Sequence, residues 1–131
     1  FEHIFKLIKD NPQYQWVSIQ GAMTDEQAAL LNGENVVSYF NFITDWYDTA
    51  GLVANLDMVV SIDTGLTHLA GGLGVPCCLL LDKYTTCWRW RLELEDTVWY
   101  PSVKIFRQKE AHGQLEQISR VQEYIAKKID P

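Results

Sequence analysis

The fold is decided by the stretch Val59-Val60-Ser61-Ile62-Asp63-Thr64-Gly65-Leu66-Thr67-His68-Leu69-Ala70. Its first four residues are nearly all aliphatic, which is typical of a strand buried on both faces. Asp63-Thr64-Gly65 then predicts a sharp turn, and small and apolar residues continue at helical spacing. A buried strand that leads directly into a helix is typical of a parallel α/β sheet.

Helix and strand signals alternate on both sides of this stretch. The pattern predicts helices at 1–8, 24–32, 48–56, 64–73 and 115–129, strands at 16–20, 36–40, 58–62, 77–81 and 103–106, and a long aromatic loop at 83–101 with at most one helical turn. Repeated β-α-β units with right-handed crossovers predict a Rossmann-like open parallel sheet with helices on both faces, formed by residues 1–131 as a single domain. Ligands bind such sheets beyond the carboxyl ends of the strands.

Composition narrows the class of partner. The chain has 131 residues, of which 47% are hydrophobic, so it can close an ordinary core. A formal charge of -6 argues against nucleic acid and anionic membrane surfaces as partners. No apolar stretch approaches the roughly 18 residues that span a bilayer, and no signal peptide is evident, so we expect a cytoplasmic protein. The chain opens at Phe1 without a methionine, which suggests a fragment.

The cysteines indicate neither a disulfide framework nor a metal site. The chain has 3 cysteines, and Cys77 and Cys78 are adjacent within an apolar run without metal-ligand spacing. We therefore expect buried, reduced thiols that point to opposite faces of a strand.

Charge is unevenly distributed along the chain. Residues 10–82 contain nine acidic residues, from Asp10 to Asp82, and no lysine or arginine. An anion bound in this stretch must therefore be held by backbone amides and neutral donors, or by later cations that reach over it.

The start of the predicted helix at Thr64 has the features of an anion site. Helix-start amides lack intrahelical acceptors and carry the positive end of the helix dipole, and Gly65 allows close approach to the backbone. Thr64 and His68 are four residues apart, so a hydroxyl and an imidazole share one helix face. A diphosphate would fit this arrangement. The alternative is that Asp63 or Thr64 only caps the helix and that His68 packs with its ring nitrogens satisfied.

Several blocks in the same order resemble a known family. The chain reads Asp-Thr-Ala-Gly-Leu-Val-Ala-Asn-Leu-Asp at 48–57 and Ser-Ile-Asp-Thr-Gly-Leu-Thr-His-Leu-Ala-Gly-Gly-Leu-Gly-Val-Pro at 61–76, followed by Trp88-Arg89-Trp90, Trp99-Tyr100-Pro101 and Ile105-Phe106-Arg107-Gln108. From Trp16 onward the chain resembles the family 9 glycosyltransferases, the heptosyltransferase group. The later blocks resemble the related domain that follows tetratricopeptide repeats in bacterial proteins.

This resemblance implies the carboxyl-terminal, nucleotide-sugar-binding half of a type B glycosyltransferase. Such enzymes invert the anomeric centre without a metal ion, and their donor substrate takes the place of a cofactor. The motif implies donor binding by Asp63, Thr64, Gly65, Thr67 and His68, with Asp63 orienting the turn through backbone amides. The family's general base comes from an amino-terminal domain that this chain lacks. We therefore expect no catalytic residue here and no activity from this chain alone.

The chain departs from the family pattern at one position. The family tends to carry a lysine after the first strand of this half, whereas this chain reads Gln20-Gly21-Ala22-Met23. Gln20 and Gly21 are therefore possible donor contacts. Lys83 or Arg89 could replace the lysine if the loop folds back over the site. The expected partners are a nucleotide sugar and either a missing amino-terminal acceptor domain or tetratricopeptide repeats.

Two alternatives to a transferase stay open. One is a catalytically inactive nucleotide-binding or protein-interaction module, which the departure at Gln20 favours. The other is a subunit of a retroviral-type aspartic protease, because an apolar pair followed by Ser-Ile-Asp-Thr-Gly is also the active-site sequence of those enzymes. Such proteases are nearly all β, so the helical pattern after Gly65 argues against this alternative.

Overall fold

The computed structural model describes residues 1–84 and 87–130. Residues 85–86 of the predicted loop and residue 131 of the predicted domain lie outside the described residues. The chain divides into two compact units, residues 1–48 and 49–131. The α/β class with parallel strands is confirmed, but the strands form two sheets, β1-β2 and β3-β4-β5, rather than one.

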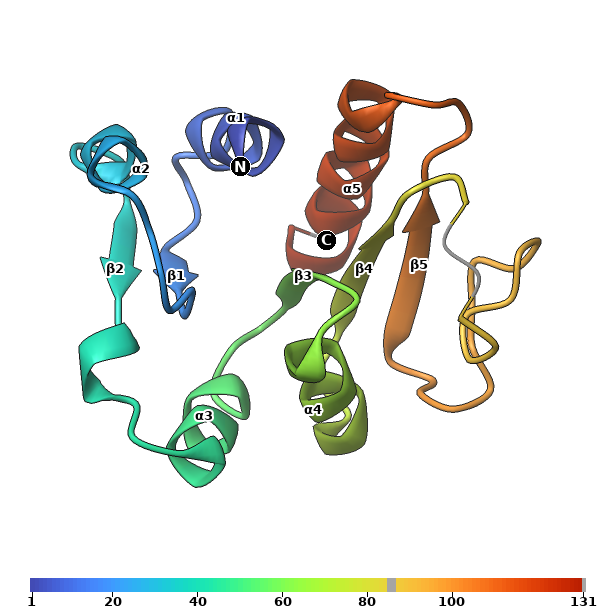
Figure 1. Ribbon diagram of the computed structural model, residues 1–131, viewed down its shortest axis with the longest axis horizontal. Helices are drawn as coiled ribbons and strands as arrows, with labels where there is room; N and C mark the ends of the chain where they lie inside the picture. The colour runs from blue at the N-terminus through green and yellow to red at the C-terminus, as the bar shows by residue number, and fades with distance from the viewer. Residues whose placement is uncertain (85–86, 131) are drawn as a thin grey trace. The chain divides into compact units, whose positions relative to one another are not determined.

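The first unit pairs two short strands. Its elements are α1 (Glu2–Lys9), β1 (Trp16–Ser18), α2 (Asp25–Leu31), β2 (Val36–Ser38) and the 3-10 helix η1 (Phe40–Phe42) (Figure 1). β1 and β2 are parallel, with Trp16 opposite Val36. Thr24 and Gln27 form a capping box at the start of α2, where each side chain accepts a hydrogen bond from the other's backbone N–H at 3.2 and 3.1 Å. The predicted helix start is therefore confirmed.

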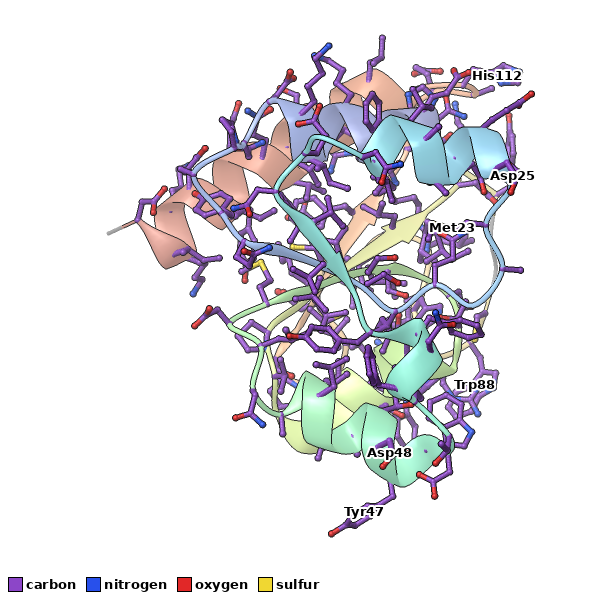
Figure 2. All side chains as sticks on the ribbon, turned by 90° about the vertical axis from the view of Figure 1, so that its left-hand side faces the viewer. Met23, Asp25, Tyr47, Asp48, Trp88 and His112 are labelled. Carbon is purple, nitrogen blue, oxygen red and sulfur yellow. The ribbon has the colours of Figure 1, made fainter. Side chains whose placement is uncertain are left out.

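Two predicted boundaries near the end of this unit are wrong. The strand predicted at 36–40 ends at Ser38, because the Tyr39 carbonyl accepts from the Phe42 N–H at 2.9 Å and the chain turns into η1. Helix α3 (Trp46–Val53) begins two residues before the predicted start at Asp48. Asp45 accepts from the Asp48 N–H at 2.9 Å and so caps the helix. The exposed Tyr47 points away from this first turn (Figure 2).

Asp48 itself holds the segment that enters α3. Its carboxylate accepts from the backbone N–H and the hydroxyl of Thr44 at 2.9 and 2.6 Å. These bonds hold the pKa of Asp48 below its ordinary value, because they stabilise the ionised form. Asp48 is therefore a structural residue of the helix start.

The second unit is a parallel sheet of three strands. β3 (Val59–Ile62), β4 (Cys77–Leu81) and β5 (Val103–Arg107) lie in the order β3-β4-β5, so β4 is hydrogen-bonded on both sides. All five residues of β4 are buried, and its bounds are those predicted. The continuous apolar run at 77–81 thus corresponds to the central strand of the sheet.

Helices cover both faces of this sheet. On one face, α4 (Gly65–Leu73) packs against β3 and β4, with the Thr67 hydroxyl near the Cys77 thiol. On the other, Tyr124 of α5 (Gln114–Ile129) contacts the Phe106 ring at 5.5 Å between ring centroids. Leu80 pairs with Phe106 in the register, so Cys78, two residues from Leu80, lies on the α5 face while Cys77 lies on the α4 face. The two thiols are free and buried, as predicted.

The described part of the loop at 83–101 folds back along β5. The Glu95 carbonyl accepts from the Ile105 N–H at 2.6 Å, and Asp96 and Lys104 form an isolated antiparallel bridge. Lys104 also pairs with the Glu95 and Asp96 carboxylates at 3.0 and 3.5 Å, which raises the pKa of Lys104. Within residues 1–84 and 87–130, no helix has the length and apolar character that crossing a membrane requires.

The environment of the thiols predicts their reactivity. Burial raises the pKa of Cys77 to about 12 and raises that of Cys78 as well, so neither forms the reactive thiolate at about pH 8. Cys87 is only half-buried. We expect an aromatic disulfide reagent to modify Cys87 rapidly in the native chain and the other two only after unfolding. In Cys87→Ser the rapid phase should disappear; a rapid phase that persists would contradict the burial of the β4 thiols.

Candidate functional site

The start of α4 lies directly after β3 and is not capped by its own side chain. Thr64 occupies the N-cap position, but its side chain accepts no capping hydrogen bond. Its hydroxyl lies 3.2 Å from the Ser61 hydroxyl instead. The first amides of a helix have no intrahelical acceptor and carry the positive end of the dipole. The Thr67 N–H donates to the Thr64 carbonyl at 3.1 Å, so the amides available to an anion are those of the exposed Gly65 and the half-buried Leu66. The alternative that the Thr64 side chain only caps the helix is not supported.

Asp63 faces His68 rather than the turn. Asp63 Oδ1 lies 3.8 Å from His68 Nε2, and the two side chains are 31% and 35% exposed. Among the described residues, no backbone N–H of the turn donates a hydrogen bond to this carboxylate, although such bonds were expected. Asp63 therefore places a carboxylate beside the imidazole of His68. The expectation that Asp63 orients the turn by accepting from its backbone amides is wrong.

The other nitrogen of His68 is hydrogen-bonded. Nδ1 lies 2.9 Å from the phenol oxygen of Tyr100. The imidazole also stacks on the indole of Trp90, with ring centroids 5.3 Å apart and planes at 29°. Trp90 is fully buried, so it forms a fixed wall against the ring. His68 is thus held through one nitrogen and one face, while Nε2 points toward the partly exposed Asp63 side of the site.

Gly71 creates the space that Tyr100 occupies. A Cβ at position 71 would lie 2.7 Å from Tyr100 Cδ1 and 2.8 Å from its Cβ. His68 and Gly71 are three residues apart and so share a face of α4. The Tyr100 ring lies over this glycine, and its phenol reaches the imidazole.

Thr67 points into the fold. Its side chain is fully buried, and its hydroxyl donates to the Ile62 carbonyl at 2.8 Å. That bond ties the first turn of α4 to the last residue of β3. Of the predicted donor-binding residues, Asp63, Thr64, Gly65 and His68 are brought together at the carboxyl end of β3, and Thr67 lies beneath them.

The predicted cations have other contacts. Lys83 Nζ pairs with Glu110 at 3.0 Å, and this carboxylate raises the pKa of Lys83. The Arg89 guanidinium lies 4.3 Å from the centroid of the Trp88 ring. The loop does fold back, as the prediction for Lys83 or Arg89 required. However, the loop residues that contact His68 are aromatic, Trp90 and Tyr100, rather than cationic.

Gln20 and Gly21 belong to the first unit. The Gln20 amide donates to the Ala22 carbonyl at 3.0 Å. A Cβ on Gly21 would lie 2.9 Å from Phe40 Cε2, so the glycine is needed for this close packing. Neither observation indicates a ligand. Over residues 1–84 and 87–130, no three histidine, cysteine or acidic side chains gather as a metal ion would require.

Trp90 and Tyr100 are site residues that sequence patterns do not reveal. Both lie in a segment without helical or strand periodicity, where exposed and buried aromatic residues look alike. Their signal is the pair of blocks Trp88-Arg89-Trp90 and Trp99-Tyr100-Pro101, but nothing in those blocks indicates contact with His68.

No family model matches the chain. Protein FlbA of Caulobacter vibrioides is 28% identical over 109 residues, which cover 79% of this chain and 18% of that protein. No solved structure matches the chain. The glycosyltransferase resemblance therefore stands as a proposal.

Neighbouring glycines in α4 provide a matched test of the Tyr100 contact. Gly71→Ala should destabilise the chain by about 1–3 kcal/mol, because the added methyl displaces the Tyr100 ring. Gly72→Ala should be neutral or stabilising by up to about 1 kcal/mol, because nothing lies within 4 Å of its Cβ and alanine favours helix. Urea denaturation measures both changes. Equal effects of the two substitutions would contradict the contact.

Proposed function

We propose that residues 49–131 bind the diphosphate of a nucleotide sugar, as the donor-binding half of an inverting, metal-independent glycosyltransferase. The observation that carries the proposal is the uncapped start of α4 at Thr64, beside the partly exposed Asp63 and His68. Its position at the carboxyl end of β3 supports the proposal, because parallel α/β sheets bind ligands there. The inverting, metal-independent chemistry is taken from the family resemblance.

The chemistry of sugar transfer fits this donor set. When the bond from sugar to diphosphate breaks, negative charge develops on the leaving phosphate oxygens. Backbone amides at a helix start, a hydroxyl and an imidazole N–H stabilise such charge and are already in place before the reaction. In the proposal the amides at Gly65 and Leu66, the Thr64 hydroxyl and His68 Nε2 face the diphosphate. This arrangement requires no lysine or arginine within the acidic stretch before residue 83.

The remaining predicted residues have lesser roles in the proposal. Thr67 supports the turn through the Ile62 carbonyl. Lys83 follows the carboxyl end of β4, but its charge is paired with Glu110, so the proposal assigns it no contact with the diphosphate. The proposal assigns no deprotonation of the acceptor to the described residues.

A second candidate is a nucleotide-binding or protein-interaction module without transferase activity. The observation that favours it is the exposure of apolar residues on the loop: Trp88 is 61% exposed, Val98 77% and Trp99 54%. Exposed apolar clusters of this kind are common at protein interfaces. The helix that begins at Gly65 and the parallel sheet argue against the protease alternative, because those enzymes are nearly all β.

Calorimetric titration of the chain with UDP, ADP and GDP tests the diphosphate site. One nucleotide should bind, and His68→Ala should weaken it about ten-fold or more, because a hydrogen bond to a charged group contributes about 1.5–3 kcal/mol. Thr64→Val should weaken it less. The matched control is His112→Asn, since His112 is exposed on the same unit and asparagine tolerates its φ of 61°.

Two outcomes would contradict the proposal: binding of none of the three nucleotides, or equal binding by the wild type and His68→Ala. Incubation of the full-length protein with radiolabelled nucleotide sugars then separates the two candidate functions, because no activity is expected from this chain alone. Nucleotide release that depends on His68 favours a transferase, whereas nucleotide binding without turnover in the full-length protein favours the inactive module.

A further inference from the structure

Two aromatic rings, those of Trp90 and Tyr100, restrict the imidazole of His68. Trp90 stacks on one face, and Tyr100 meets the ring edge-on, with centroids 5.6 Å apart and planes at 70°. The Trp90 and Tyr100 rings are themselves 6.2 Å apart. Rotation of the imidazole would therefore have to displace a buried tryptophan, and the two nitrogens keep separate neighbours.

Those neighbours differ in hydrogen-bonding capacity. A tyrosine phenol both donates and accepts, whereas an ionised carboxylate only accepts. A neutral imidazole has one N–H and one acceptor nitrogen. With the proton on Nδ1, the lone pair of Nε2 would face the Asp63 carboxylate at 3.8 Å, which is unfavourable. With the proton on Nε2, Nδ1 accepts from the Tyr100 phenol at 2.9 Å and Nε2–H points toward an acceptor.

We propose that Tyr100 is a positioning residue that, together with Asp63, fixes His68 as its Nε2–H tautomer. The Asp63 carboxylate disfavours a bare lone pair on Nε2, and a phenol O–H is a stronger donor than its oxygen is an acceptor, so Tyr100 favours an unprotonated Nδ1. The role of this tautomer rests on the proposed function, because a phosphate oxygen can accept a hydrogen bond from His68 only if Nε2 carries a proton. Tyr100 acts only through the imidazole. Its ring is held over Gly71, and its backbone carbonyl accepts from the Val103 N–H at 3.0 Å, which ties it to the start of β5.

Asp63 has a defined part in this arrangement. The 3.8 Å separation from His68 Nε2 exceeds hydrogen-bond length, so the carboxylate orients the N–H without fully occupying it. A bound phosphate oxygen can then accept this N–H without first breaking a strong hydrogen bond. The site thus presents one neutral donor of fixed direction beside the amides of α4.

Tyr100→Phe tests the inference, since phenylalanine keeps the ring over Gly71 and removes only the phenol. The matched control is Tyr124→Phe, which makes the same change on α5, at the other face of the sheet. The readout is the tautomer of His68 in the ligand-free chain, from long-range ¹⁵N–¹H NMR of the imidazole rings at a pH where they are neutral. The His68 signals are identified by their loss in His68→Ala.

The wild type and Tyr124→Phe should show His68 with its proton on Nε2. Tyr100→Phe should show a mixture of both tautomers, and its nucleoside diphosphate affinity should fall about two- to ten-fold, the range for one uncharged hydrogen bond. A proton on Nδ1 in the wild type, or an unchanged tautomer in Tyr100→Phe, would overturn the inference. So would unchanged affinity in Tyr100→Phe when the wild type binds nucleotide.

The test separates this inference from the proposed function. If the tautomer responds as expected but UDP, ADP and GDP all fail to bind, the proposed diphosphate site is wrong and the control of His68 by Tyr100 is supported. If a nucleotide binds through His68 but the tautomer does not depend on Tyr100, the proposed function is supported and the positioning role is wrong.

Discussion

The central position of β4 is the constraint on which the second unit depends. Its five residues are all buried, so every backbone N–H and C=O must find a partner within the protein. Pairing with β3 and β5 meets this requirement along the strand. At its end, the Leu81 carbonyl accepts from the Gln108 N–H and the buried Gln117 side chain. These bonds align the carboxyl ends of the strands and tie α5 to the sheet.

The same alignment places the candidate site. Thr67 joins α4 to the last carbonyl of β3, and Gly71 brings the loop residue Tyr100 against the helix. Three of the nine residues of α4 are glycines, which favour the helix less than other residues do apart from proline. Contacts with the sheet and the loop must therefore hold α4 in place. The geometry at Thr64 and His68 is a product of tertiary packing rather than of local helix preference.

The elements that could be predicted from sequence are those with strong local signals. The apolar run at 77–81 is a central strand with the expected bounds, and the helix expected to begin at Thr24 does so through a capping box of Thr24 and Gln27. Boundaries were missed where two local signals compete, as with Asp45 and Asp48 at the start of α3. The division into two sheets and the contacts of Trp90 and Tyr100 with His68 depend on long-range pairing, which single-sequence patterns do not encode. Asp63, Thr64, Gly65 and His68 could be grouped because they are neighbours in the chain.

The lack of space at Gly71 also couples two distant positions in the amino-acid sequence. A side chain at position 71 would collide with the ring and the Cβ of Tyr100, so it requires a smaller residue at position 100 and a shift of the backbone there, whereas an aromatic ring at position 100 favours glycine at position 71. Substitutions at the two positions are therefore not independent. A substitution at Gly71, or one that removes the ring at Tyr100, disrupts the contact, so the order in which such changes accumulate determines which of the intermediate sequences still fold.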